Sequence, residues 1–183
     1  MRLEKISEKN RPLLTRAFAL YESSFPIEER RDRKEQERVF AHPDYHCDLI
    51  LENSDLVGIL FYWEREEFVF LEHFATLPEI RGSGKGSQAL ELLKNKGKTV
   101  ILEIEPPVDE ITNRRYAFYR RNGFFMTPHY HIQAKYRLTD KDVELKILSY
   151  PRPITREEYL AFRAYMDREI GISTERTDLF DQL

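Results

Sequence analysis

The stretch from residue 68 to residue 105 constrains the fold of this chain more than any other part of the sequence. Residues 68–77 are apolar at both odd and even positions except at Glu72 and His73, a pattern typical of a strand that is covered on both faces. A glycine-rich loop follows, then apolar residues at helical spacing over 89–93, then a second β-rich run at 99–105. A strand, a helix and a second strand in this order predict two parallel strands joined by a crossover helix.

The rest of the chain divides into helices and strands by the same periodicities and by its turn residues. We expect further strands at residues 2–7, 47–52 and 56–64, and a hairpin formed by residues 130–138 and 143–149. We expect helices at residues 11–22, 26–40, 109–122 and 155–170. The three runs between residues 47 and 77 follow one another closely, which predicts an antiparallel meander whose last strand lies near the centre of the sheet.

The composition indicates a compact folded protein and excludes several classes. The chain has 183 residues, of which 41% are hydrophobic and 13% aromatic, whereas disordered chains are poor in aromatic residues. Its longest mainly apolar run without a charge, residues 56–63, is far shorter than the roughly 20 residues that cross a bilayer. The N-terminus lacks the apolar core of a signal peptide, so we expect a cytoplasmic protein with no membrane partner.

The net charge and the cysteine content exclude further classes of partner and site. A formal net charge of −3 gives no basic footprint of the kind that binds nucleic-acid backbones, so we expect no nucleic-acid partner. The sequence contains one cysteine, Cys47, which excludes an internal disulfide and a multi-cysteine zinc site. We expect no metal site.

The glycine-rich loop at residues 81–87 does not fit two common phosphate-binding motifs. A Walker A loop needs Gly-Lys-Ser/Thr, but Gly84 and Lys85 are followed by Gly86. A dinucleotide fingerprint needs G-x-G-x-x-G, but the glycines here stand at every second position. What remains is a strand that leads through glycines into a helix N-terminus, where backbone N–H groups attract phosphates.

The side chains of the loop support this interpretation. They supply positive charge and hydroxyl donors, at Arg81, Lys85, Ser83 and Ser87. A flexible turn with a few exposed charges is the alternative that the glycines alone leave open.

Two stretches resemble the signatures of the GNAT superfamily of N-acetyltransferases. The loop resembles the family's acetyl-CoA motif, R/Q-x-x-G-x-G/A, with Arg81, Gly84 and Gly86 at its defining positions. Residues 117–124, Ala-Phe-Tyr-Arg-Arg-Asn-Gly-Phe, resemble the A-x-Y-x-x-x-G-F segment at the end of the family's fourth helix. This chain differs from the family pattern at one position. Many members carry an asparagine there, whereas this chain has Thr112, followed by Asn113.

The resemblance implies an α/β fold of the α+β kind. The central sheet is expected to be mixed and mostly antiparallel, splayed between its fourth and fifth strands and flanked by helices. Residues 1–150 form the expected acetyl-CoA-binding domain. Residues 151–183 are then a C-terminal helical extension, packed either on this domain or on a partner subunit, which leaves a homodimer open.

The resemblance also implies where acetyl-CoA binds as the co-substrate. Its pantetheine arm is expected to pair with free backbone groups of the fourth strand, where one N–H polarises the thioester carbonyl. Its phosphates are expected over the glycine-rich loop. The cofactor-binding residues predicted in this way are Phe74, Ala75, Thr76, Arg81, Gly82, Ser83, Gly84, Lys85, Gly86 and Ser87.

Two side chains are predicted to be catalytic. The resemblance brings Tyr119 to the sulfur as the general acid that protonates the departing thiolate, and a tyrosine packed in the core is the alternative. Glu72 is the predicted general base, because burial in its strand raises the pKa of a carboxyl group, and Glu103 on the neighbouring strand is its competitor. His73 has the opposite strand parity, so it faces the same cleft as Glu72 only across a bulge, and the family often bulges there.

The predicted function is transfer of an acetyl group from acetyl-CoA to a primary amine by direct attack in a ternary complex. The acceptor is expected to be a small-molecule amine or a peptide amine. Its pocket is expected beside residues 21–31, where Glu22, Glu28 and Glu29 can attract a cation, and His129 and His131 are further candidates for its lining. Two alternatives stay open: a non-catalytic acyl-CoA-binding module that regulates a partner, and a phosphate-handling nucleotide enzyme.

Overall fold

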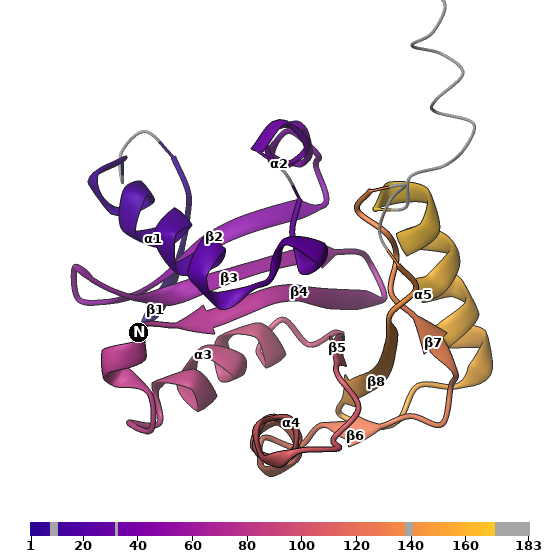
Figure 1. The fold of residues 1–183 in the computed structure, drawn as a ribbon. Helices are drawn as coiled ribbons and strands as arrows, with labels where there is room; N and C mark the ends of the chain where they lie inside the picture. The colour runs from indigo at the N-terminus through magenta and orange to yellow at the C-terminus, as the bar shows by residue number, and fades with distance from the viewer. Residues whose placement is uncertain (8–10, 32, 138–140, 171–183) are drawn as a thin grey trace, which may run out of the picture.

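The computed structural model describes residues 1–7, 11–31, 33–137 and 141–170 of the chain (Figure 1). Its strands are β1 (Arg2–Lys5), β2 (Tyr45–Glu52), β3 (Asp55–Glu64), β4 (Phe68–Thr76), β5 (Thr99–Ile104), β6 (Phe125–Met126), β7 (His131–Ile132) and β8 (Glu144–Tyr150). Its helices are α1 (Arg11–Ser24), α2 (Arg33–Phe40), α3 (Lys85–Lys94), α4 (Glu110–Arg121) and α5 (Arg156–Glu169), with 3₁₀ turns at Ile27–Glu29 and Pro78–Ile80.

The strands form a mixed central sheet in the order β1–β2–β3–β4–β5–β8–β6, and β7 pairs with β8. Neighbouring strands are antiparallel except β4 and β5, which are parallel and connected through α3. The predicted crossover, the predicted meander and the predicted fold class are therefore confirmed.

Helices cover both faces of the sheet (Figure 1). On one face, which we call the α5 face, three helices bury a core that includes Ala17 of α1, Val39 of α2 and Phe162 of α5. On the other, which we call the α3 face, Leu90 and Leu93 of α3 pack against the sheet, and α4 adds partly buried aromatic residues. The strands between them are apolar on both parities because both of their faces are covered.

The sheet parts between β4 and β5, as the splayed fold predicts. The two strands pair only from Phe68 opposite Thr99 to Leu71 opposite Leu102. Beyond Leu71, β4 runs on to Thr76 with β3 on one edge, and within the described residues no strand pairs with its other edge. This free edge carries backbone N–H and C=O groups that a ligand can bind.

A β-bulge lies where the sheet parts. Phe61 of β3 is opposite His73, but the next residue, Tyr62, is opposite Leu71, so Glu72 is the extra residue on β4. The extra residue shifts the alternation of side chains, and both Glu72 and His73 therefore lie on the α5 face. The bulge that this pair of residues requires is confirmed.

The segment predicted as one helix over residues 26–40 is broken in the structure. A 3₁₀ turn ends at Glu29, Arg30 is extended with φ −138° and ψ 150°, and α2 begins only at Arg33. The physical reason is Arg31, whose buried side chain reaches Glu72 of β4. The predicted strand at 130–138 was also too long, because only His131–Ile132 is a strand.

The C-terminal helix packs on the sheet of its own chain. Thr155 and Glu158 form a capping box at its start. The Phe162 ring lies 5.8 Å from the ring of Phe68 and 5.1 Å from that of Phe70, both on β4. Residues 171–183 lie outside the described residues, and the division of the chain at residue 150 stays a prediction.

Gly58 of β3 controls how closely β3 and β4 approach, and its replacement tests the register. A Cβ at this position would stand 2.3 Å from the carbonyl oxygen of Ala75, so Gly58→Ala should push the strands apart. Overpacking of this kind costs about 1–3 kcal/mol of the free energy of unfolding, measured by urea denaturation. Gly86→Ala is the matched control, since its Cβ would meet the movable Phe118 ring at 3.3 Å. Equal stabilities of Gly58→Ala and the parent chain would contradict the register.

Candidate active site

The glycine-rich loop forms an open N-terminus for α3. Gly82 and Gly84 have φ values of 82° and 81°, in the left-handed region that favours glycine, and Gly84 is the N-cap residue of α3. A Cβ added to either would meet nothing within 4 Å. The loop surface is therefore accessible, and the first amides of α3 are directed outward as a phosphate site requires.

The polar side chains of the loop differ in the contacts that they make with the rest of the protein. Lys85 forms an ion pair with Glu52 at the end of β2, and the Ser83 hydroxyl donates to the carbonyl oxygen of Ile80 at 2.6 Å. Arg81 is exposed and has no ion pair among the described residues. Arg81 can thus meet a phosphate directly, whereas Lys85 must first release Glu52.

The loop, the free edge of β4 and α4 meet at Gly86. A Cβ on Gly86 would lie 3.3 Å from the ring of Phe118 and 3.7 Å from that of Phe74. The centres of the Phe74 and Phe118 rings are themselves 6.5 Å apart, and the two ring planes are inclined by 30°. Because Gly86 has no side chain, the helix can approach these rings closely, which joins the two signatures of the sequence into one place on the α3 face.

Tyr119 lies at this meeting point. Its ring packs against those of Phe118 at 5.2 Å and Phe124 at 5.6 Å, and it is half-buried. Burial raises the pKa of Tyr119 to about 12, so the phenol stays protonated at neutral pH. Its hydroxyl makes no hydrogen bond to the described residues, which leaves its proton available for a ligand.

Thr112 and Asn113 fix the start of α4 and so the position of Tyr119. Thr112 N–H donates to the carboxylate of Asp109 at 2.8 Å, and the two residues form a capping box. The Asn113 side chain donates to the carbonyl oxygen of Asp109 at 2.7 Å. Both side chains are thus engaged within the helix start.

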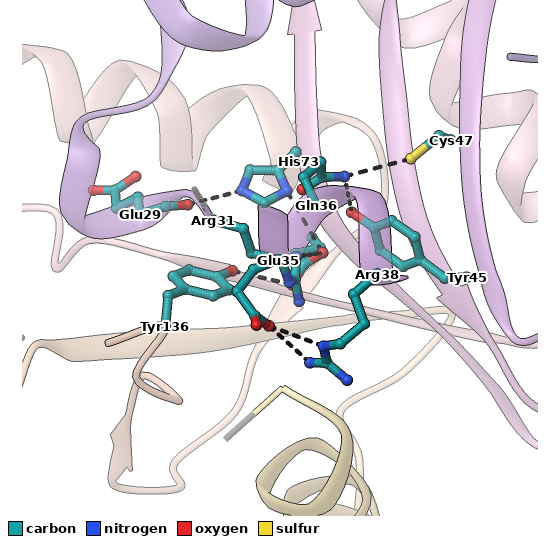
Figure 2. A network of polar contacts seen from close by, with 10 residues as sticks. Glu29, Arg31, Glu35, Gln36, Arg38, Tyr45, Cys47, His73 and Tyr136 are labelled. Carbon is teal, nitrogen blue, oxygen red and sulfur yellow. Dashed lines mark hydrogen bonds and ion pairs between the residues drawn. The ribbon is translucent and has the colours of Figure 1, made fainter. Parts of the chain in front are cut away.

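Glu72 forms a buried ion pair with Arg31 on the α5 face. The guanidinium Nη1 lies 2.8 Å from Oε2 and Nη2 lies 2.7 Å from Oε1, in the two-pronged geometry that gives such pairs their strength. The side chains are 1% and 3% exposed. The Tyr136 hydroxyl adds a third hydrogen bond, to Oε1, at 3.0 Å, within the network of Figure 2.

The expected rise in the pKa of Glu72 is wrong. Burial alone would raise it, but the charge of Arg31 and the contacts with His73 and Arg31 outweigh burial and hold the pKa of Glu72 well below its ordinary value. A carboxylate with so low a pKa and with both oxygens occupied is a poor proton acceptor. The sequence showed no sign of Arg31 or Tyr136 as its partners, because they lie 41 and 64 residues away along the chain.

The predicted acceptor side is held together by basic side chains. Arg137 donates to the carbonyl oxygens of Ile27 at 2.6 Å and Arg30 at 2.9 Å. His73 donates through Nε2 to the carbonyl oxygen of Glu29 at 2.8 Å. Glu22 is exposed and lies 3.8 Å from Arg30, and the side chain of Glu28 lies outside the described residues. That these carboxylates attract a cationic amine stays a prediction.

A second carboxylate faces the same side from β5. Glu103 comes directly after Leu102, the last residue of β5 that pairs with β4. It lies 2.5 Å from Nε2 of His131. It also lines a cavity of about 10 Å³ that Phe70 and Tyr136 share, roughly enough for one water. His129, the other predicted lining histidine, instead stacks on Tyr159 and contacts the carbonyl oxygen of Ile154 at 3.1 Å.

Cys47 is buried near the ion pair but is unsuited to attack. The amide Nε2 of Gln36 lies 3.7 Å from its sulfur (Figure 2). Burial, together with the charge of Glu72, raises the pKa of the Cys47 thiol well above its ordinary value. The reactive thiolate is therefore disfavoured.

Two properties of the described residues concern metals and membranes. Among them, no group of three or more His, Cys, Asp or Glu side chains is arranged to hold a metal ion. No helix formed by these residues has the length and apolar character needed to span a bilayer.

A sheet that parts beside an open glycine loop and a half-buried tyrosine defines an acetyl-CoA-dependent acetyltransferase fold. The family model of the Acetyltransferase (GNAT) family matches residues 12–124, and the chain belongs to this family. It is an N-acetyltransferase, with acetyl-CoA as co-substrate and an amine as acceptor.

Individual relatives agree with this assignment. The Bacillus subtilis (strain 168) protein named "Putative acetyltransferase YjbC" is 28% identical over 84% of this chain and 85% of its own length. A solved GNAT-family protein of Bacteroides thetaiotaomicron is 27% identical, with a TM-score of 0.87 over 94% of this chain and 100% of that one. An aminoglycoside 6'-N-acetyltransferase complexed with coenzyme A shares the fold, with a TM-score of 0.57, 15% identity, and coverage of 84% and 100%.

The Arg31–Glu72 pair should show strong coupling in a double-mutant cycle. Arg31→Met leaves a buried carboxylate without its counter-ion and should cost about 3–5 kcal/mol of the free energy of unfolding. The double variant Arg31→Met/Glu72→Met should recover part of this loss, because no buried charge remains. Urea denaturation measures the free energies of unfolding of the parent chain, Arg31→Met, Glu72→Met and the double variant. A double variant as unstable as the sum of the single variants would show that the pair is not coupled.

The same pair predicts a dependence of stability on pH. Because the pKa of Glu72 is lower in the folded chain than in the unfolded one, its contribution is complete above the unfolded value of about 4.3 and is lost as the pH falls below it. Glu72→Gln should therefore flatten the fall in unfolding free energy below about pH 4.3. Glu66→Gln, in the exposed turn before β4, is the control and should keep the parent slope.

Proposed function

We propose that this N-acetyltransferase transfers the acetyl group to a primary amine by direct attack in a ternary complex. The observation that carries the proposal is the free edge of β4 beyond Leu71, which opens between the glycine loop, Tyr119 and the α5 face. An extended ligand that pairs with this edge has its phosphate end at the loop and its reactive end near the bulge. The acceptor is a small-molecule amine or a peptide amine.

The residues present fit acetyl-CoA. Backbone groups of Phe74, Ala75 and Thr76 are proposed to bind the pantetheine arm, since their edge of β4 has no strand partner among the described residues. The loop residues Arg81, Gly82, Ser83, Gly84, Lys85, Gly86 and Ser87 are proposed to hold the phosphates, through the amides of the α3 N-terminus and the exposed Arg81. When bound, acetyl-CoA supplies the acetyl group as a thioester.

Proton donor and proton acceptor are proposed to lie on opposite faces of the parted sheet. Tyr119 belongs to the α3 face, whereas Glu72 lies on the α5 face with Arg31 and Tyr136. The amine then approaches from one face, and the leaving thiolate takes its proton from Tyr119 on the other. For Glu72, the contacts favour a positioning role over the catalytic role predicted for it, because its oxygens are already bound.

Direct attack is supported by the state of the cysteine. An acyl-enzyme route needs a reactive nucleophile, and the pKa of the buried Cys47 thiol is raised. The amine can attack the thioester itself once it is neutral, and positioning of two bound substrates supplies a large part of the rate enhancement.

Tyr119→Phe tests the proposed acid. The variant should lower kcat by about tenfold to a thousandfold, because general-acid catalysis contributes on this scale, while the Kd for acetyl-CoA stays unchanged. The assay measures release of free thiol with a panel of spermidine, kanamycin and peptides with free N-termini, and calorimetry gives the Kd. Tyr116→Phe, on the same helix and also partly buried on the α3 face, is the control.

The outcomes separate the alternatives. Unchanged turnover by Tyr119→Phe would remove this residue from the mechanism. Binding of acetyl-CoA by the parent chain, without turnover of any acceptor in the panel, would favour the regulatory binding module.

A further inference from the structure

A carboxylate from another part of the chain pairs with one cation of the glycine loop. Nζ of Lys85, the first residue of α3, forms an ion pair with Glu52, the last residue of β2. The two residues are 33 positions apart in the sequence. The side chain of Lys85 is 26% exposed and that of Glu52 is 39% exposed. An acidic side chain thus stands at the proposed phosphate site, where a ligand in solution can reach it.

The start of α3 supplies no anion of its own. Its N-cap residue, Gly84, makes no side-chain cap bond, and the first turn of the helix contains no acidic residue. The free amides at the start of a helix and the positive end of its dipole both favour a negative charge nearby. Glu52 is therefore a carboxylate that the fold brings to a helix start whose own sequence has none.

The two cations of the loop differ in what a phosphate must displace. Arg81 is exposed and has no ion pair in the part of the chain that the structure describes, whereas Lys85 is paired with Glu52. Exposed ion pairs contribute little to stability, so a phosphate that reaches the Lys85 ammonium can replace the carboxylate. The exchange leaves the Glu52 charge beside the bound phosphates, and charges of the same sign repel.

We propose that Glu52 is a specificity-determining residue of the donor site, because its carboxylate competes with the phosphates of acetyl-CoA for Lys85. This inference rests on the proposed function, which places those phosphates over the loop. In the exchange, Nζ of Lys85 leaves a carboxylate oxygen and meets a phosphate oxygen, and no covalent bond changes. The coenzyme A product carries the same phosphates as the donor. Glu52 therefore weakens the binding of both and favours release of the product.

Glu52→Gln tests the competition, because it removes the charge and keeps the size of the side chain. Calorimetry at low ionic strength, with coenzyme A as the probe, should give a Kd about threefold to tenfold lower than that of the parent chain. This is the scale of one exposed ion pair together with the repulsion that is removed. The gain should shrink as salt is added, since salt screens exposed charges.

Asp55 provides the matched control. It lies opposite Glu52 in the hairpin between β2 and β3, is exposed, and has no ion pair within the described ranges. Asp55→Asn removes the same charge from the same hairpin and should leave the Kd for coenzyme A unchanged. An equal gain in Asp55→Asn and Glu52→Gln would show an effect of net charge alone and would overturn the role of Glu52.

A double-mutant cycle separates competition for Lys85 from simple repulsion. Lys85→Met should raise the Kd for coenzyme A, because one cation of the site is lost. In this background Glu52→Gln should lower the Kd by a smaller factor than in the parent chain, since no ammonium remains for the carboxylate to hold. The same factor in both backgrounds overturns the competition. Urea denaturation checks that every variant is folded, and Glu52→Ala is the second variant if Glu52→Gln is not.

The outcomes distinguish this inference from the function on which it rests. If the parent chain binds coenzyme A and Glu52→Gln has the same Kd, the role of Glu52 is overturned and the proposed function stands. A higher Kd in Glu52→Gln also overturns the competition, because it would mean that the pair holds Lys85 ready for the phosphates. If the parent chain does not bind coenzyme A, both the inference and the proposed function fail.

Discussion

The parting of β4 from β5 is the constraint on which the rest of the site depends. Unpaired backbone groups cost free energy unless something binds them, yet the pairing of these strands ends at Leu71 and Leu102 while β4 continues to Thr76. The end of the pairing coincides with the bulge at Glu72. The free edge of β4 beyond the bulge lies beside the glycine loop and Tyr119. All of the proposed contacts with the ligand therefore lie along this edge or next to it.

The buried ion pair at the bulge holds together the segments where the acceptor is proposed to bind. Arg31 is enclosed by aromatic rings as well as by Glu72: its guanidinium carbon lies 4.8 Å from the centre of the Tyr136 ring and 5.4 Å from that of Tyr45. Both charges have lost water, which is costly unless every partner is in place. The pair therefore links the segment before α2, the bulge of β4 and the segment around Tyr136, which are far apart in the sequence. The attraction between the two charges and their hydrogen bonds offset the cost of burial.

The two faces of the sheet give the ionisable groups different environments. On the α3 face, burial raises the pKa of Tyr119 to about 12, which keeps the proposed acid protonated at neutral pH. On the α5 face, both oxygens of Glu72 are bound by Arg31 and Tyr136, while Glu103 bonds to His131 and lines a small cavity. The Tyr119 phenol and the two carboxylates therefore lie on opposite faces of the sheet.

The sequence by itself determined the features that depend on neighbours along the chain. These are the periodicity of the strands and helices, the glycines at positive φ before α3, and the motif that places Tyr119 at the end of α4. The tertiary structure decided the rest. It broke the predicted helix at Arg31, lowered the pKa of Glu72 instead of raising it, and brought His131 to Glu103. The physical reason is that the charge state of a buried carboxylate depends on which distant side chains reach it, and spacing along the chain carries no record of those partners.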